Sequence, residues 1–138
     1  MMLKSKLAAV AGALILAGSA FAGQESVCPN INDIKAEGIA MAEEIGPNLY
    51  LSYNISNYNT ESTWGFIIAP LEGDSADVAI EEANEVLSTI SAPGVPEQHG
   101  DVILCDYDTG RQDLFAAAIN DNLQITPMRL KYFFKRAR

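Results

Sequence analysis

The chain has 138 residues, with 9 basic and 18 acidic side chains and a formal net charge of −9 at pH 7. This length suits a single domain that is large enough to bury a hydrophobic core. The negative charge argues against the classes of protein that bind nucleic acid or anionic lipid, because such a surface repels both.

Residues 1–22 have the pattern of a cleavable signal peptide. Lys4 and Lys6 precede an uncharged apolar run of 12 residues, Leu7 to Gly18, and residues 20–22 form an A-x-A cleavage site. A membrane-spanning helix needs roughly 20 residues, so we expect no stable membrane anchor. The mature chain would form one domain over residues 23–138 with a net charge of −11, because the leader removes two lysines and no acid. We expect an exported protein, periplasmic or secreted.

Two cysteines, Cys28 and Cys105, remain in the mature chain. An exported chain usually meets an oxidising compartment, so we expect one structural disulfide between them. Closing so long a loop would add about 4 kcal/mol of stability in the chain-entropy model. A reactive thiol pair or a metal site is the alternative, but the C-x-x-C spacing is missing and the chain has a single histidine.

The first half of the mature chain predicts a helix followed by a hairpin. Asn30 is a candidate N-cap, and apolar residues at alternating spacings of three and four predict a helix that runs to Ile45. From Leu49 to Ser56 the period changes to two, which indicates a half-buried strand. Thr63 to Ala69 reads as a second strand, and the two would pair antiparallel.

The second half predicts another helix, two strands and a last helix. Asp74 and Ser75 open a helix with its apolar face at Ala76, Ile80, Ala83, Leu87 and Ile90. The stretch 92–100, with two prolines and two glycines, reads as a loop, and 101–107 as a third strand. Residues 112–119 fit either a helix or a strand, and we predict a strand. Thr126 and Pro127 begin a helix to about Ala137.

These elements give the order αββαββα. The predicted fold class is α+β, with a small antiparallel sheet of about four strands, helices packed on one face and one disulfide.

Two charged patterns have a structural and a functional interpretation. A cluster of bases lies near the end of the chain, either as a surface for anionic lipid or an acidic partner, or as charges that compensate the glutamate-rich second helix and the C-terminus of the last helix itself: Arg129, Lys131, Lys135, Arg136 and Arg138. We favour compensation. The stretch 106–110 resembles the start of a calcium loop but lacks its fifth and twelfth ligands, so it predicts a β-turn.

Candidate ligands and catalytic groups are few. His99, the single histidine, could bind a haem iron, with a tyrosine such as Tyr58 as the alternative donor. A solvated loop histidine is the simpler interpretation. We expect neither an enzyme nor a metal site, because the chain has no G-x-S-x-G motif and its paired acids are expected by chance.

Four stretches carry a resemblance to a known family: 28–41, 53–60, 64–70 and 107–111, the last reading Tyr-Asp-Thr-Gly-Arg. They resemble a DUF4949 family of small exported proteins from Legionella-type bacteria. Some members are labelled hemin-binding, so the resemblance implies hemin as a possible ligand, without a motif that assigns it to particular residues.

The sequence therefore predicts an exported, non-enzymatic binding protein with hemin as the candidate ligand and no certain cofactor. The alternative is a secreted protein-interaction module, such as an inhibitor or a host-directed factor. Its candidate surface would be Tyr50, Tyr58 and Trp64 on the predicted hairpin, since such side chains suit interfaces.

Overall fold

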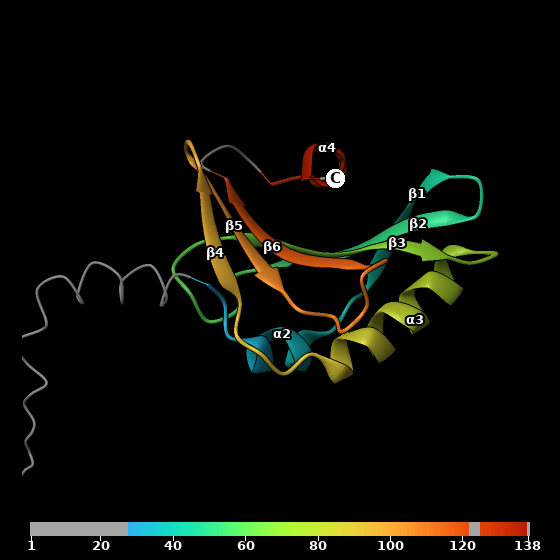
Figure 1. The fold of residues 1–138 in the computed structure, drawn as a ribbon, viewed down its shortest axis with the longest axis horizontal. Helices are drawn as coiled ribbons and strands as arrows, with labels where there is room; N and C mark the ends of the chain where they lie inside the picture. Colours follow the sequence, from blue (N-terminus) through green and yellow to red (C-terminus); the bar gives the residue numbers. More distant parts are fainter. Residues whose placement is uncertain (1–27, 122–124, 138) are drawn as a thin grey trace, which may run out of the picture.

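The computed structural model describes residues 28–121 and 125–137. The predicted leader, residues 1–22, lies outside these described residues. The described chain forms one antiparallel sheet of six strands in the order β1-β2-β3-β6-β5-β4, with helices on both sides (Figure 1). The elements are α2 (Ile31–Glu37), β1 (Met41–Gly46), β2 (Leu49–Ser56), β3 (Trp64–Glu72), α3 (Ala76–Thr89), β4 (Val95–His99), β5 (Val102–Tyr107), β6 (Phe115–Asp121) and α4 (Pro127–Ala137).

The prediction of a four-stranded sheet with the order αββαββα is wrong. The sheet has two more strands, β1 and β4, which form its two edges. The helices also do not share one face, because α2 and α3 lie on one side of the sheet and α4 lies on the other (Figure 1).

The predicted first helix is correct only in its first half. Asn30 caps α2 as expected, and its Oδ1 accepts a hydrogen bond from the Asn32 amide at 2.8 Å. The helix ends at Glu37 because Gly38 has a φ of 75°, a conformation that ends helices and favours glycine. Residues 41–46 then pair with β2 as β1. The spacing of four between Met41 and Ile45 puts both residues on one face of a helix, and it also puts them on one face of a strand. The prediction of a helix here was wrong because this spacing fits both structures.

The predicted loop 92–100 contains the edge strand β4. Its residues pair antiparallel with β5, with Pro96 opposite Cys105 and His99 opposite Val102. Proline is tolerated in a strand mainly at the edge of a sheet, where its missing N–H costs no ladder bond. The proline count that indicated a loop is therefore compatible with this strand.

The other predicted elements are confirmed within a few residues. The strand predicted in 112–119 is β6, whose buried Ala116, Ala117 and Ala118 let helices approach both faces of the sheet closely. Ser75 caps α3 by accepting a hydrogen bond from the Val78 amide at 3.3 Å. Thr126 accepts one from the Arg129 amide at 3.2 Å, as its predicted capping role requires.

The sheet separates two hydrophobic cores. Along β3, Phe66 and Ile68 point towards α2 and α3, while Ile67 and Ala69 point towards α4, and all four are fully buried. This continuous apolar run has no polar alternation because both faces of the strand are covered. Among the described residues, no helix is both long and apolar enough to cross a membrane.

The disulfide between Cys28 and Cys105 is present and joins the segment before α2 to β5, with a Cα–Cα distance of 5.9 Å. The Tyr107 hydroxyl reinforces this junction by donating a hydrogen bond of 2.6 Å to the Pro29 carbonyl. A disulfide is consistent with an oxidising compartment outside the cytoplasm.

Candidate binding site beside the disulfide

A cleft of about 540 Å³ lies beside the disulfide on the α2 side of the sheet. Three segments line it: residues 28–33 at the start of α2, residues 58–60 after β2, and residues 91–94 after α3. Its polar side chains are Asn30, Asn32, Asp33, Asn59, Thr60 and Ser91. A volume of this size suits a small molecule.

Short hydrogen bonds hold the polar wall in place. Asn59 donates from Nδ2 to Asp33 Oδ1 at 3.2 Å, which ties the loop after β2 to α2. The Thr60 hydroxyl donates to the Asn57 carbonyl at 2.6 Å and accepts from Trp64 Nε1 at 3.1 Å. The wall is therefore anchored to both α2 and the buried start of β3.

The same wall contains two residues in the left-handed region of backbone space. Tyr58 has a φ of 49° and Asn59 a φ of 61°. Asparagine tolerates this conformation, but a tyrosine there is uncommon, and such residues cost about 1–3 kcal/mol each. Strain of this kind persists only where the surrounding contacts impose it, as they do around the buried ring of Tyr58.

The Tyr58 hydroxyl is buried and has no hydrogen-bond partner among the described residues. Burial, and then the negative charge of Glu37, raise the pKa of this hydroxyl above its usual value. The nearby Asn54 side chain acts in the opposite direction and lowers the pKa, although it does not reach hydrogen-bond geometry with the hydroxyl. The residue therefore stays a neutral phenol in the folded protein.

The charge of the cleft is negative. Asp33 is the single charged residue among the described residues that line it, and none of these is a lysine or arginine. The whole chain adds a formal net charge of −9. The cleft is therefore suited to a neutral or cationic ligand and not to an anion.

The two predicted haem ligands do not lie together. Tyr58 lines the cleft, whereas His99 lies at the far end of β4, with 63% of its side chain exposed and its Nε2 3.1 Å from Glu97 Oε1. His99 lies five positions after Gly94 of the cleft along an extended strand, a rise of about 17 Å. One ligand could not be held by both residues.

The predicted aromatic interaction surface is mostly buried. Tyr58 and Trp64 are each 1% exposed and belong to the core on the α2 side. Tyr50 is half-buried and packs against the same core. These three residues are therefore structural in the folded chain, and the hairpin presents no aromatic patch built from them.

The basic residues of α4 that the structure describes pair with acids of the domain. Arg129 forms an ion pair with Asp121 of β6, and Lys131 Nζ lies 3.3 Å from Glu43 Oε1 of β1. The interpretation of charge compensation named the glutamates of α3, but the acids that pair with these two bases lie on strands β6 and β1. The side chains of Lys135, Arg136 and Arg138 lie outside the described residues.

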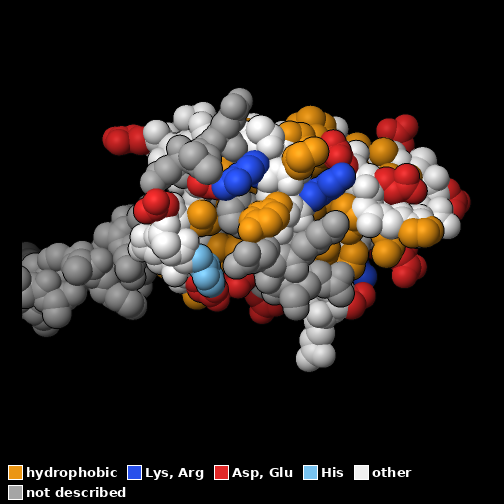
Figure 2. Space-filling model, turned by 90° about the horizontal axis from the view of Figure 1, so that it is seen from above, with side chains coloured by type: hydrophobic (Ala, Val, Ile, Leu, Met, Phe, Trp, Pro, Cys, Tyr) orange, Lys and Arg blue, Asp and Glu red, His pale blue; other side chains and the backbone are white. Residues whose placement is uncertain are grey.

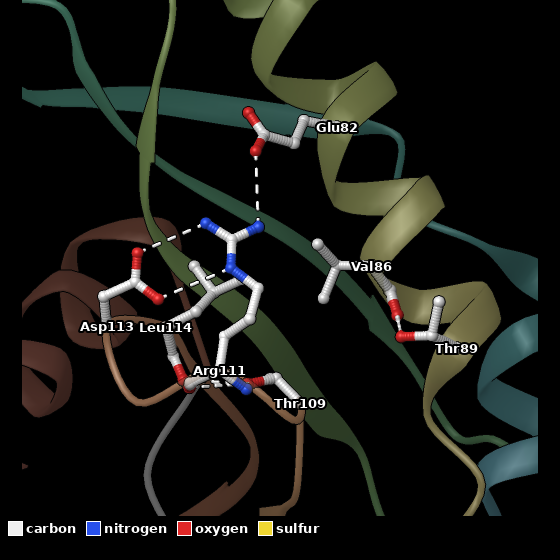
Figure 3. A network of polar contacts seen from close by, with 7 residues as sticks. All are labelled: Glu82, Val86, Thr89, Thr109, Arg111, Asp113 and Leu114. Atoms are coloured by element: carbon white, nitrogen blue, oxygen red, sulfur yellow. Dashed lines mark hydrogen bonds and ion pairs between the residues drawn. The ribbon is translucent and has the colours of Figure 1, made fainter.

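A second hollow, of about 530 Å³, is lined in part by a charge network at Arg111, which Figure 3 shows. The guanidinium of Arg111 lies 3.5 Å from Glu82 of α3 and 3.3 Å from Asp113, so it clamps the loop before β6 to the helix. The hydrogen bond from Arg111 lowers the pKa of Asp113. Two carboxylates already neutralise the charge of the Arg111 guanidinium. This described part of the hollow therefore has no uncompensated positive charge that would attract an anionic ligand.

The β-turn predicted at 106–110 is displaced, because Asp106 and Tyr107 belong to β5 and the backbone turn bond of 3.3 Å runs from the Leu114 amide to the Arg111 carbonyl. The Gly110 amide donates to Asp108 Oδ1 at 2.8 Å, and Gly110 has a φ of 78°. Within the described residues, no group of three or more potential metal ligands comes together.

Sequence reasoning missed most of the cleft. Asn32, Asn59 and Ser91 come from three segments that were predicted only as a helix start and as connections. Their one shared signal is a concentration of asparagine, serine and threonine around two proline-containing stretches, which is also typical of ordinary turns.

Comparison with protein families supports the resemblance seen in the sequence. The family model described as Domain of unknown function (DUF4949) matches residues 27–133. This range includes the disulfide, the cleft and all six strands. Comparisons with curated proteins and with solved structures gave no significant match. The chain belongs to the DUF4949 family.

Proposed function

We propose that the protein is an exported, non-enzymatic binding protein that takes a small organic amine into the cleft beside the disulfide. The observation that carries this proposal is a cleft of about 540 Å³ whose described lining has Asp33 and several amide and hydroxyl groups but no basic residue. Carboxylate and amide oxygens accept hydrogen bonds from an ammonium group. The disulfide and the predicted leader support export to the periplasm or beyond the cell.

The charge of the molecule favours the same ligand class. A formal net charge of −9 raises the local concentration of small cations around the protein and lowers that of anions. At the cleft, the Asp33 carboxylate accepts a hydrogen bond of 3.2 Å from Asn59 Nδ2, which limits the rotation of the carboxylate. A fixed acceptor binds more tightly than a mobile one, because less conformational entropy is lost on binding.

Isothermal titration calorimetry of the disulfide-bonded protein with spermidine tests the proposal. Asp33→Asn keeps the shape of the side chain and removes its charge, so we expect the Kd to rise at least about 10-fold. Asp77→Asn is the matched control, because it removes one exposed carboxylate of α3 outside the cleft. We expect the control to change the Kd less than about 2-fold in physiological salt. Equal weakening by both variants, or no saturable binding, would contradict the proposal.

Hemin is the second candidate ligand. The observation in its favour is that Tyr58, one of the two predicted iron ligands, lies in the cleft wall with an unpartnered hydroxyl. The raised pKa of Tyr58 disfavours the phenolate that iron binds, and no described base in the lining would pair with the propionates.

An absorbance titration with hemin separates the two ligands. Binding in the cleft predicts a saturable one-to-one Soret shift that is lost in Tyr58→Phe and kept in His99→Ala. An unsaturable rise that neither substitution changes would exclude hemin and leave the amine proposal intact. A shift lost only in His99→Ala would place hemin on β4 and outside the cleft.

A further inference from the structure

The disulfide is part of the cleft wall as well as of the fold. Six of the twelve described residues that line the cleft are the consecutive residues 28–33. Cys28 is partly exposed at the start of this segment, whereas its partner Cys105 is fully buried in β5. The covalent bond therefore joins one wall of the cleft to an interior strand of the sheet.

Non-covalent contacts also hold this segment. The Tyr107 hydroxyl donates a hydrogen bond of 2.6 Å to the Pro29 carbonyl, and Asn59 donates one of 3.2 Å to Asp33. Pro29 and Ile31 are buried. However, α2 has only seven residues, and isolated helices shorter than about 12 residues are marginal in water. The first turn of α2 therefore depends on its ties to the rest of the chain, and the disulfide is the one covalent bond among them.

The far end of α2 is held independently of the disulfide. Ser56 donates a hydrogen bond of 2.6 Å to Glu37, and Asn54 donates one of 3.1 Å to the Gly38 carbonyl. Ile34 is fully buried in the core on this side of the sheet. Loss of the disulfide would therefore free the first turn, which lines the cleft, and leave the second turn in place.

The sheet keeps its own pairing around the disulfide. Cys105 pairs with Pro96 of β4 and with Ala118 of β6. As a free thiol it would remain a small buried apolar side chain. The core beneath α4, on the side that Figure 2 shows, is built from described residues that lie outside the segment 28–33. Reduction should therefore act on the cleft wall and leave the sheet folded.

We propose that the disulfide is a redox switch of the cleft, in which reduction by a dithiol frees residues 28–33 and lowers the affinity for the ligand. A thiolate of the reductant attacks Cys28 Sγ, the S–S bond breaks, and the Cys105 sulfur leaves and takes a proton. The second thiol of the reductant then displaces Cys28, which also takes a proton. The protein gains two electrons and two protons, and the reductant becomes a disulfide.

The switch would act on binding through the population of the ordered wall. The proposed ammonium acceptor, Asp33, belongs to the freed segment. A wall that is in place for one tenth of the time raises the apparent Kd about 10-fold. This effect on binding rests on the proposed function, whereas the release of the wall does not.

Hydrogen exchange of the labelled protein, before and after reduction with dithiothreitol, tests the release. The Asp33 and Ile34 amides donate to the Asn30 carbonyl at 3.0 and 3.2 Å, and the Gly38 amide donates to the Ile34 carbonyl at 2.9 Å. We expect reduction to raise the exchange rates of the Asp33 and Ile34 amides at least about 10-fold and that of the Gly38 amide less than about 3-fold. The dispersed amide shifts of β3 and β6 should persist.

Cys28→Ser with Cys105→Ala is the matched control, because this double variant has no disulfide to reduce. Its Asp33 and Ile34 amides should exchange fast with or without dithiothreitol. Unchanged exchange at these two amides in the reduced natural chain, or a rise of equal size at Gly38, would overturn the proposal. Loss of the dispersed shifts of the sheet on reduction would overturn it as well, because the whole chain would then unfold.

Calorimetry with spermidine compares binding to the oxidised and the reduced natural chain. We expect reduction to raise the Kd at least about 10-fold. Equal Kd values in the two states would overturn the switch. No binding to the oxidised chain, together with faster exchange at Asp33 and Ile34 on reduction, would contradict the amine proposal and support the release of the wall.

Discussion

Two buried tyrosines beneath the cleft differ in one hydrogen bond. The Tyr107 hydroxyl donates to the Pro29 carbonyl at 2.6 Å, whereas the Tyr58 hydroxyl has no partner among the described residues. Burial is the main cause that raises the pKa of both hydroxyls above the usual 10.0. The folded chain therefore holds protons that the unfolded chain releases, so these two residues lower its stability as the pH rises above 10.

This difference predicts opposite effects of the same substitution. Tyr107→Phe leaves a buried carbonyl without its donor and should lower the free energy of unfolding by about 2 kcal/mol. Tyr58→Phe removes a hydroxyl that is buried without a partner and should raise the free energy of unfolding by about 1 kcal/mol. Urea denaturation of both variants at pH 7 measures the two values. A loss of stability in Tyr58→Phe would mean that its hydroxyl does have a partner.

At the scale of single residues, the sequence could identify candidate residues from the chemistry of their side chains, but it could not show where those side chains lie in the folded chain. The pairing of Cys28 with Cys105 was predictable because the chain has no other cysteine. The burial of Tyr58 was not, because an aromatic residue in a polar hairpin loop has the same local pattern whether it points inwards or outwards. The loop is tied to α2 by the hydrogen bond from Asn59 to Asp33, and Tyr58 packs into the core on that side.

At the scale of elements, the change from α2 to β1 depends on one side chain of α3. Asn84 accepts a hydrogen bond of 2.9 Å from the Ile39 amide and donates one of 3.0 Å to the Ile39 carbonyl. The amide group thus satisfies both backbone groups of the residue between the helix and the strand. This contact spans 45 positions, so no local pattern predicts it, and the sequence therefore favoured a continuous helix over 30–45.

Removing that side chain should weaken the edge of the sheet. Asn84→Ala leaves the Ile39 amide and carbonyl without partners and should lower the free energy of unfolding by about 2 kcal/mol. Ser88→Ala, in the same helix, removes only an exposed local bond to the Glu85 carbonyl and should cost less than about 0.5 kcal/mol. Thermal and urea denaturation compare the two. Similar losses in both variants would contradict the role given to Asn84.

The elements with strong periodicity or capping signals were predictable, and the two edge strands were not. Ser75 and Thr126 begin α3 and α4 as their capping chemistry requires. β4 contains Pro96 and is bordered by glycines, so its sequence resembles a loop, and only its pairing with β5 makes it a strand. An edge strand forms its backbone hydrogen bonds with one neighbouring strand only. Its own sequence pattern is therefore a weak indicator that it is a strand.

The whole molecule has two sides with different surfaces, separated by one sheet. The α2 and α3 side bears the polar cleft and the exposed acids Asp77, Glu81 and Glu85 of α3, while the α4 side bears the exposed side chain of Met128 and the ion pairs of Arg129 and Lys131. The sequence predicted the acidic balance and the helix that begins at Thr126 and Pro127. It could not place α4 on the opposite side from α2 and α3, because hydrophobic periodicity shows which face of a helix is buried and not which face of a sheet it covers.

The most direct test of the proposed function is a map of amide chemical shifts in the labelled, disulfide-bonded protein during titration with spermidine. The account predicts saturable shifts at Asn32, Asn59 and Ser91, from the three segments that meet only in the cleft. The amides of Met128 and Tyr132 on the far side of the sheet should not move. Shifts centred on Asp77, Glu81 and Glu85 would contradict the account, because they would show that the amine is held by surface charge alone.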